Sequence, residues 1–208
     1  MVKIGVLADS HVKDRVRGLH PGVCDVFKSA MVSQIWHAGD VCTNEVIDEL
    51  RAIAPVRVVQ GNADVLMGCR FPMMVDETVE GVRLAMTHGQ GKFSKYLRDR
   101  FSSLVFGPKQ FSYFEHQIID LLPREANVLI YGHVHVAVNR WQNGQLLFNP
   151  GSCSLPVYKN RHPSVGILTI DGSLVSGEIV FLDEVHHTDL TPILRVFSHL
   201  RKGRKGTH

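Results

Sequence analysis

The chain has 208 residues, of which 44% are hydrophobic and 21% charged, a balance typical of a soluble globular domain and not of a disordered or fibrous protein. No apolar run approaches the roughly 20 residues that span a bilayer, and the four cysteines form no Cys-x-x-Cys pair, so neither a membrane span nor a zinc knuckle or thiol redox motif is indicated. Five basic residues from Arg195 onward account for the net charge of +3 and leave the remainder at −2. We expect a cytoplasmic protein with one domain over 1–182 and a basic tail over 183–208.

The first half of the chain alternates short β-branched runs with helical stretches. The expected strands are 2–7, 34–37 and 56–60, and the expected helices are 23–31 and 45–52. This rhythm is typical of βαβ units and predicts a largely parallel sheet. Each strand is followed by polar residues, in the segments Ala8-Asp9-Ser10-His11, Ala38-Gly39-Asp40 and Gly61-Asn62-Ala63-Asp64. Because ligands bind outside the carboxyl ends of strands in open α/β sheets, we expect these three loops to meet in one crevice.

The second half has glycine-containing turns between alternating runs. Gly accepts the positive φ of tight turns, so hairpins are expected at Glu80-Gly81, Asn143-Gly144 and Asp171-Gly172. The runs 83–87 and 128–131 predict strands that deliver histidines to the same rim, in His88-Gly89 and Gly132-His133-Val134-His135. The last runs, 145–148, 166–170 and 174–181, predict a second sheet of antiparallel character. We therefore expect two packed sheets with helices outside them.

The segment 90–125 separates two of the histidine motifs. Residues 93–106 and 110–122 fit two amphipathic helices separated by Pro108. The first helix carries several cations, Arg98 among them, that are candidates to bind substrate phosphates. A solvated outer face is the alternative interpretation of these cations.

Seven residues at the expected strand ends have the chemistry of metal ligands. A single histidine has little meaning, because a lone histidine on an apolar element is usually part of the core. The joint placement beside glycines and other ligand types indicates a site formed by Asp9, His11, Asp40, Asn62, His88, His133 and His135. Mixed imidazole and carboxylate ligands suit manganese, iron, zinc or nickel. Seven ligands exceed the needs of one such ion and fit two divalent ions that share an aspartate, an arrangement suited to phosphoryl transfer.

The order of these motifs closely resembles the calcineurin-like metallophosphoesterase superfamily, and within it the small single-domain phosphodiesterases of bacteria and archaea. The resemblance is carried by Asp9-x-His11, Gly39-Asp40, Gly61-Asn62, His88-Gly89 and Gly132-His133-x-His135, and it extends over residues 1 to about 182. Asn149-Pro150-Gly151-Ser152 and Pro163-Ser164-Val165-Gly166 resemble the same branch. The resemblance implies an α/β fold, a four-layer αββα sandwich in which two mixed β-sheets are flanked by helices.

The resemblance also implies a role for each residue. One ion would be held by Asp9, His11, Asp40 and His135. The other ion would be held by Asp40, Asn62, His88 and His133. Asp40 becomes the bridging ligand, a choice that the residues alone leave open between Asp40 and Asp9. Manganese is the expected metal. The expected catalytic residues are Asp40, Asn62 and His88, and the expected substrate contacts are Asn62, His88 and Arg98. His37 is expected either to orient a ligand from behind or to pack at the end of its strand, and Asp64 to fix its loop through backbone hydrogen bonds.

One departure from the family pattern bears on the reaction. Many members have Gly-Asn-His, in which the histidine helps to protonate the leaving group and to bind phosphate, whereas this chain has Gly61-Asn62-Ala63. Loss of a positioned general acid typically costs about 10²–10⁴-fold in rate, most for alkoxide leaving groups. We therefore expect in-line hydrolysis of phosphodiesters with good leaving groups, by a hydroxide that bridges the metals. Gln90 stands where relatives often carry a further histidine, and the length of 90–125 predicts a cap over the crevice.

Two other functions stay open from the sequence. A non-catalytic scaffold, like the retromer subunit that resembles this family, would tend to lose ligands, whereas every ligand position is filled here. A nuclease would use the basic tail for electrostatic attraction, although the rest of the chain is slightly acidic. The expected partner is a small-molecule phosphate ester. Nucleic acid and a homo-oligomer remain alternatives, and no membrane contact is expected.

Overall fold

A computed structural model describes residues 1–90, 111–155 and 162–183 of the chain. Its first sheet has five strands in the order β10-β9-β1-β2-β3. Their bounds are β1 (Val2–Leu7), β2 (Gln34–His37), β3 (Val56–Val58), β9 (Ser164–Asp171) and β10 (Leu174–Phe181). The helices α1 (Pro21–Ala30) and α2 (Asn44–Arg51) connect β1 to β2 and β2 to β3, and these three strands are parallel. The predicted βαβ units are therefore present.

The second sheet also has five strands, in the order β4-β5-β6-β8-β7. Their bounds are β4 (Met74–Val79), β5 (Val82–Thr87), β6 (Val128–Tyr131), β7 (Ala137–Gln142) and β8 (Gln145–Pro150). The central strands β5, β6 and β8 are parallel, and β4 and β7 are antiparallel to their neighbours at the two edges. Both sheets are thus mixed.

The prediction that the last three runs share one antiparallel sheet is wrong. β8 pairs in parallel with β6, with Ile130 opposite Phe148. β9 pairs antiparallel with β1 of the first sheet, with Ile4 opposite Leu168, and carries β10 with it. The period-2 pattern identifies these strands but does not say which open sheet edge each one joins.

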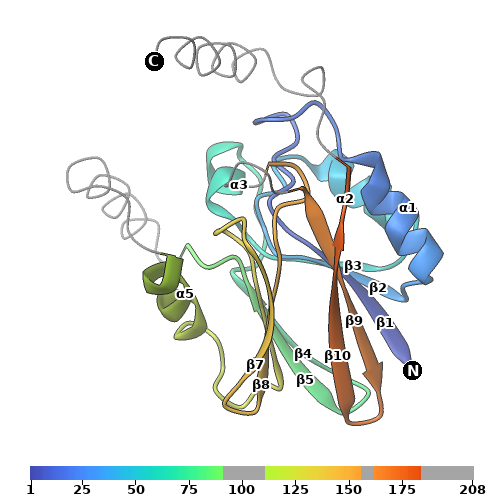
Figure 1. Ribbon diagram of the computed structural model, residues 1–208. Coiled ribbons are helices and arrows are strands. Elements are labelled where there is room, and N and C mark those ends of the chain that lie inside the picture. Colours follow the sequence, from blue (N-terminus) through green and yellow to red (C-terminus); the bar gives the residue numbers. More distant parts are fainter. Residues whose placement is uncertain (91–110, 156–161, 184–208) are drawn as a thin grey trace, which may run out of the picture.

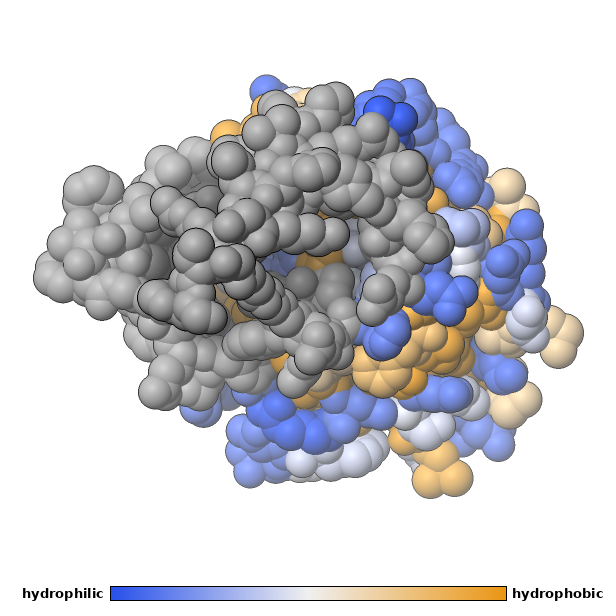
Figure 2. Space-filling model, turned by 45° about the horizontal axis from the view of Figure 1, so that its top comes forward, coloured by the Kyte–Doolittle hydropathy of each residue, from blue (hydrophilic) through white to orange (hydrophobic). Residues whose placement is uncertain are grey.

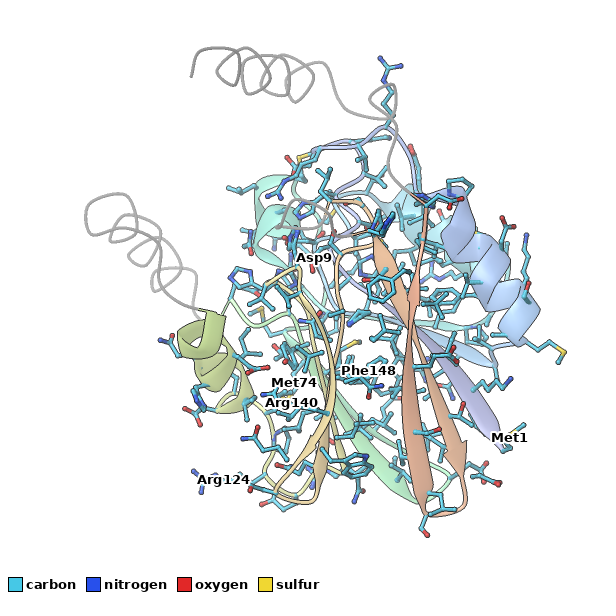
Figure 3. All side chains as sticks on the ribbon, viewed as in Figure 1. Met1, Asp9, Met74, Arg124, Arg140 and Phe148 are labelled. Atoms are coloured by element: carbon cyan, nitrogen blue, oxygen red, sulfur yellow. The ribbon has the colours of Figure 1, made fainter. Side chains whose placement is uncertain are left out.

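Three apolar clusters separate four layers of secondary structure, which confirms the predicted αββα sandwich. The cluster between the first sheet and its helices contains Leu7, Phe27 and Leu50. The cluster between the two sheets contains Trp36 and Phe148, and Figure 3 shows Phe148 in the middle of the molecule. A third cluster packs α5 (Phe111–Ile119) against the second sheet. Figure 1 shows the same order, with α1 and α2 on one outer side and α5 on the other.

Strand β1 shows how the sequence builds these layers. Ile4 and Val6 face the space between the sheets, whereas Leu7 belongs to the cluster beneath the helices, as the two-residue period of a strand requires. Gly5 lies between Ile4 and Val6 and faces α1. A Cβ at this position would lie 2.8 Å from the ring of Phe27 on α1, so the absence of a side chain lets the helix approach closely. Both faces of β1 are therefore buried, and the strand is followed directly by the buried residues Ala8 and Asp9.

The local predictions hold in most of the described chain. The turn residues Glu80 and Asn143 have φ values of 50° and 51°, and the glycines that follow them are also left-handed. Helix α5 lies within the predicted 110–122, whereas the predicted helix 93–106, most of the predicted cap, Arg98 and all but one residue of the basic tail lie outside the described residues. The patterns do not predict α3 (Asn62–Leu66), a short helix that begins inside a ligand motif.

The surface gives two further facts about the described chain. None of its helices is long and apolar enough to cross a membrane. Figure 2, in which the top of the molecule is turned forward, shows a band of hydrophobic residues between hydrophilic ones on the coloured part of this face.

Candidate metal centre

The loops after β1 and β2 are joined by backbone hydrogen bonds. The N–H of Asp9 donates to Gly39 O at 3.0 Å, and the N–H of His11 donates to Asp40 O at 2.9 Å. The parallel pairing of β1 with β2 brings these loops to the same end of the sheet. Two of the three polar loops therefore meet as expected.

Five of the seven predicted ligands have a left-handed backbone. Their φ values are 55° for Asp9, 49° for His11, 58° for Asp40, 70° for His133 and 52° for His135. Residues other than glycine adopt this conformation uncommonly, and such residues gather at functional sites because the surrounding fold must hold them there. The local backbone strain is thus concentrated on the residues that the sequence singles out.

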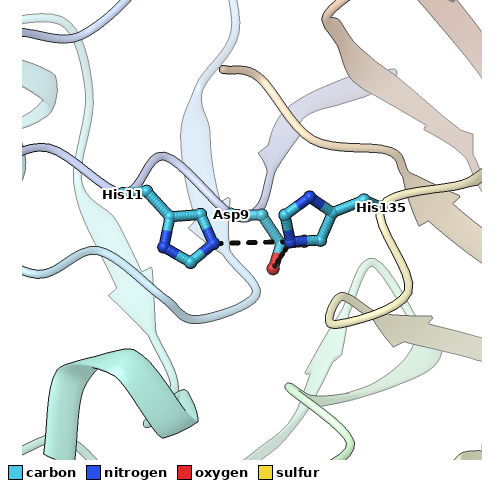
Figure 4. Close-up of side chains that lie close together, drawn as sticks. All are labelled: Asp9, His11 and His135. Atoms are coloured by element: carbon cyan, nitrogen blue, oxygen red, sulfur yellow. Dashed lines mark hydrogen bonds and ion pairs between the residues drawn. The ribbon is translucent and has the colours of Figure 1, made fainter. Parts of the chain in front are cut away.

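One group of side chains forms around Asp9. His135 Nε2 lies 3.2 Å from Asp9 Oδ1 and 3.4 Å from His11 Nε2, and Figure 4 shows the two rings turned toward each other beside the carboxylate. The other oxygen, Asp9 Oδ2, accepts the backbone N–H of His133 at 3.2 Å. Asp9 and His11 are fully buried, and His135 is 8% exposed.

A second group forms around Asp40. Its Oδ2 lies 3.5 Å from His11 Nε2 and 3.4 Å from His88 Nε2. Its Oδ1 accepts the backbone N–H of Ala63 at 2.7 Å, which places the neighbouring Asn62 beside the same carboxylate. Asp40 Oδ2 therefore lies close to histidines of both predicted ligand sets.

The remaining predicted ligands complete the cluster. Asn62 is 6% exposed and is the first residue of α3. The ring of His133 meets the ring of His88 edge-on, with centroids 5.1 Å apart. His88 Nε2 in turn lies 3.9 Å from Asp9 Oδ1, so the two groups adjoin. The structure brings all seven predicted residues together.

Three of the histidines are oriented by a hydrogen bond at Nδ1. The acceptors are Ala38 O for His88, Leu155 O for His135 and Asp14 Oδ2 for His11, at 2.7, 2.7 and 2.9 Å. An acceptor at Nδ1 keeps the proton on that nitrogen, so in the neutral ring Nε2 offers its lone pair to the centre. This is the usual arrangement of a metal-binding histidine.

Glycines keep the space around these ligands. A Cβ at Gly61 would lie 2.1 Å from Asp40 Oδ1, and a Cβ at Gly132 would lie 3.0 Å from His88 Nδ1. Gly39 combines a φ of +90° with a hypothetical Cβ 2.7 Å from His88 Nδ1. These three glycines, each next to a predicted ligand in the sequence, are therefore required sterically.

The residues behind the ligands also have defined roles. Asp64 accepts the backbone N–H groups of Asp40, Cys42 and Gly61 at 3.0, 2.7 and 2.8 Å, in the manner expected of it. His37 Nε2 forms a hydrogen bond of 3.0 Å with Ser10 Oγ, so His37 holds the residue that lies between the predicted ligands Asp9 and His11.

Sequence reasoning missed several supports. Asp14, which accepts the hydrogen bond from His11, lies three residues after His11, and nothing else in the sequence indicates this role. Ser152 Oγ and Ser154 Oγ donate to Asp9 O at 2.9 and 2.8 Å, and only the motif that contains Ser152 is visible in the sequence. Gln90 donates from Nε2 to Gln60 O at 2.9 Å, and so ties the loop of His88 to the segment before Gly61.

The electrostatics of the centre are those of a charge cluster. Burial alone raises the pKa of Asp9 and Asp40, but neighbouring histidines, His135 and His88 respectively, outweigh it and lower both values. Burial lowers the pKa of His88, but Asp40 outweighs it and raises that pKa to about 9. Burial, followed by repulsion from His88, lowers the pKa of His133 to about 4. The carboxylates are therefore anionic and ready to bind cations.

The residues present fit divalent metal ions. Three groups in the described chain have ligand atoms within 4.8 Å of one another, and two of them consist of predicted ligands only: Asp9 with His11 and His135, and Asp9 with Asp40 and His88. Asp9 Oδ1 and His88 Nε2 are buried and have no hydrogen bond among the described residues, which is costly unless another partner binds there. Asp9 is shared by both groups and Asp40 lies between two of the histidines, so the geometry leaves both aspartates as candidates for a bridge.

The fold and the cluster define a class of protein, a two-sheet α/β sandwich with a buried His/Asp/Asn candidate metal centre at its strand ends. Residues 2–173 match the calcineurin-like phosphoesterase superfamily domain, and the chain belongs to this superfamily, whose members use divalent metals.

Individual relatives agree with this assignment. A probable metallophosphoesterase of Methanothermobacter thermautotrophicus is 33% identical over 177 residues, which are 85% of this chain and 91% of that protein. Among solved structures, Vps29 of Chaetomium thermophilum superposes with a TM-score of 0.64 at 19% identity, over 92% of this chain and 94% of that one. An archaeal protein described as a novel phosphodiesterase superposes with a TM-score of 0.56 at 20% identity, over 86% of this chain and 100% of that one. At these identities the structural matches establish the fold.

Proposed function

We propose that this protein is a dinuclear metal-dependent phosphodiesterase. The observation that supports this most is the convergence of three imidazole Nε2 atoms, each oriented by a hydrogen bond at Nδ1, on two buried carboxylates. The name of the archaeal relative and the description of the archaeal structural neighbour point in the same direction.

The ligands divide into two sets in this proposal. One ion, manganese in preference to iron, zinc or nickel, would be held by Asp9, His11, Asp40 and His135. The second ion would be held by Asp40, Asn62, His88 and His133. Asp40 would be the bridge, as the family pattern implies. Its Oδ2 lies 3.5 Å from His11 Nε2 and 3.4 Å from His88 Nε2, one histidine of each set, which supports this choice without excluding Asp9. The bound ions would supply Lewis acidity, lowering the pKa of water and neutralising charge on the phosphoryl oxygens.

The chain's own groups prepare the site for an anionic ester. Burial of Asp9 and Asp40 keeps bulk water away from the centre, which strengthens electrostatic interactions there. Asn62 precedes Ala63, whose backbone N–H donates to Asp40 Oδ1, and its amide is suited to hold a phosphoryl oxygen as well as an ion. Ala63 has no proton to give to a leaving group, and its backbone N–H is already bonded to Asp40. The geometry therefore favours diesters whose alcohols leave without protonation.

The test is hydrolysis by the purified chain. The protein loaded with manganese is expected to hydrolyse bis(p-nitrophenyl) phosphate, and Asp40→Asn is expected to lower kcat by more than about 100-fold, because loss of a group that merely supports a ligand costs 10–100-fold. Asp25→Asn, on the exposed face of α1, is the matched control and keeps full activity. Equal rates for the Asp40 variant and the native protein would refute the proposal.

A protein-binding scaffold is the second candidate function. It is favoured by the similarity of the fold to Vps29 and by exposed apolar side chains at the end of α3 and in the segment from α3 to β4, namely Val65, Leu66, Met67 and Met73. Against it stands the complete set of candidate ligands. A chain that binds far less than one metal ion, and hydrolyses none of the phosphate esters tested, would favour the scaffold. The nuclease hypothesis, the cytoplasmic location and a homo-oligomer stay predictions.

A further inference from the structure

The loop after His11 is a closed turn that carries three charged residues at its tip. The N–H of Arg15 donates to His11 O at 2.8 Å, and the N–H of Lys13 donates to Val16 O at 2.7 Å. Val12 and Val16 are 4% and 2% exposed and anchor the turn in the core. The charged tip is therefore held at a fixed place beside the candidate metal centre.

Within this tip, Asp14 connects the centre to a cation. Its Oδ2 lies 2.9 Å from His11 Nδ1 and 3.3 Å from Arg15 Nε. The side chain of Arg15 is 35% exposed, so it lies at the boundary between the buried centre and solvent. Asp14 is the group that Arg15 contacts among the described residues, which leaves both Nη groups of the guanidinium available to a ligand.

The neighbouring cation of the loop is engaged elsewhere. Lys13 Nζ pairs with Glu45 Oε1 at 2.5 Å, on α2. Arg17 is exposed and makes no hydrogen bond or ion pair with the part of the chain that the structure describes. Arg15 differs from both of these cations because it pairs with Asp14 Oδ2, the same oxygen that accepts the hydrogen bond from the candidate ligand His11.

A cation at this place needs a counter-charge that the chain does not supply in full. Two divalent ions would add further positive charge, and Asp14 offsets only one cation. A position where cations accumulate is one that attracts an anion.

We propose that Arg15 is a substrate-binding residue that contacts the anionic oxygens of the phosphoryl group, on the His11–His135 side of the centre. The inference rests on the proposed function and deepens it. Arginine is suited to this contact because its planar guanidinium can donate two parallel hydrogen bonds to phosphate oxygens. It would supply a phosphate contact in a chain where Ala63 cannot provide one.

The test compares Arg15→Gln with Arg17→Gln in the full-length, manganese-loaded chain. The Arg15 variant is expected to raise KM for bis(p-nitrophenyl) phosphate, and the Kd of inorganic phosphate measured by calorimetry, by roughly 10- to 100-fold with a smaller change in kcat. The Arg17 variant is expected to match the native protein. Arg15→Lys keeps the charge but loses the two parallel hydrogen bonds. Its Kd for phosphate should therefore lie between the values of the native protein and of Arg15→Gln.

Two results would overturn the inference. The first is an unchanged phosphate Kd in Arg15→Gln, or in Arg15→Lys if the glutamine variant does not fold. The second is a loss of manganese affinity by the same factor as the loss of phosphate affinity, because Arg15 would then act only through Asp14 and His11. Failure of the proposed function looks different: the native protein would bind phosphate in a manner dependent on Arg15 and hydrolyse no diester, and the assignment of Arg15 would stand.

Discussion

The backbone N–H of Asp40 donates a hydrogen bond of 3.0 Å to the carboxylate of Asp64. The same carboxylate accepts N–H groups from Cys42 and Gly61, so it joins the loop after β2 to the loop after β3. Because Asp40 and Asn62 lie in these loops, the placing of two proposed ligands depends on a residue that we assign to neither metal.

Asp64→Asn is expected to weaken both the fold and the centre. The amide offers one oxygen instead of two and turns an N–H₂ group toward backbone donors, and each buried group left without a partner costs about 1–3 kcal/mol. We expect the free energy of unfolding to fall by that amount and manganese affinity to fall roughly 10–100-fold, the usual cost of losing a group that orients a ligand. Denaturant titration and calorimetry measure the two effects. If Asp64→Asn behaves like the exposed control Asp25→Asn, the role given to Asp64 is wrong.

Gly61→Ala is expected to displace the proposed bridge. Gly61 has a φ of −97°, which alanine tolerates, so the effect is steric and not conformational. The new Cβ would lie 2.1 Å from Asp40 Oδ1 and 2.3 Å from Asp40 N. A displacement of about 1 Å at a catalytic group can cost 10²-fold in rate, and we expect at least that loss in kcat/KM.

Gly18 provides the matched control for this substitution. A Cβ at Gly18 would meet nothing within 4 Å, so Gly18→Ala should keep the activity of the native protein. An active Gly61→Ala variant with unchanged metal affinity would show that Asp40 is not confined as the structure indicates.

The rate should depend steeply on the leaving group. Ala63 cannot protonate the departing oxygen, so a series of aryl phosphodiesters should react more slowly as the pKa of the phenol rises, and alkyl phosphomonoesters should be poor substrates. Ala63→His is expected to reduce this dependence, because a positioned general acid contributes about 10²–10⁴-fold. The measurement is log kcat/KM against the pKa of the phenol. A flat dependence in the native protein would mean that another group protonates the leaving oxygen.

His37 should make the protein sensitive to mild acid. Its ring is fully buried, and burial lowers its pKa from 6.5 to about 3, so the fold holds it neutral while the unfolded chain binds a proton. Keeping His37 neutral therefore lowers the free energy of unfolding in acid. This loss is absent above pH 6.5, grows as the pH falls below 6.5 and is complete near pH 3. Each pH unit in this window corresponds to about 1.4 kcal/mol, or roughly 2 kcal/mol between pH 6.5 and 5.

The comparison for His37 is between two glutamine variants in metal-free buffer. His37→Gln cannot take up this proton and should lose less stability than the native protein from pH 6.5 to 5, whereas His116→Gln, on the exposed face of α5, should follow the native curve. Parallel curves for all three proteins would contradict the assignment of a neutral His37.

Much of the candidate site is predictable because its residues follow strands. Asp9, Asp40 and His88 each come within three residues of the end of an apolar run, and parallel strands bring such ends to one edge. The supports are less visible, because Asp14 and Ser154 act through single hydrogen bonds that leave no periodic pattern. The choice of bridge between Asp9 and Asp40 also depends on distances of a few tenths of an ångström, which no pattern carries.

For the fold too, some features follow from sequence patterns and others do not. The period of two in 166–170 predicts a strand, but its pairing with β1 depends on which sheet edge is open when the chain returns, a property of the whole topology. The short α3 was hidden for a different reason. It begins at Asn62, within the ligand motif, and its five residues are too few for a helical period to appear.

Anomalous diffraction from crystals of the manganese-loaded protein would locate the two metal ions that we propose these loops hold with Asp40 between them. We expect two anomalous peaks about 3.5–4 Å apart, both within bonding distance of the Asp40 carboxylate. A single peak, or peaks that lie away from Asp40 while the chain keeps this fold, would contradict this proposal.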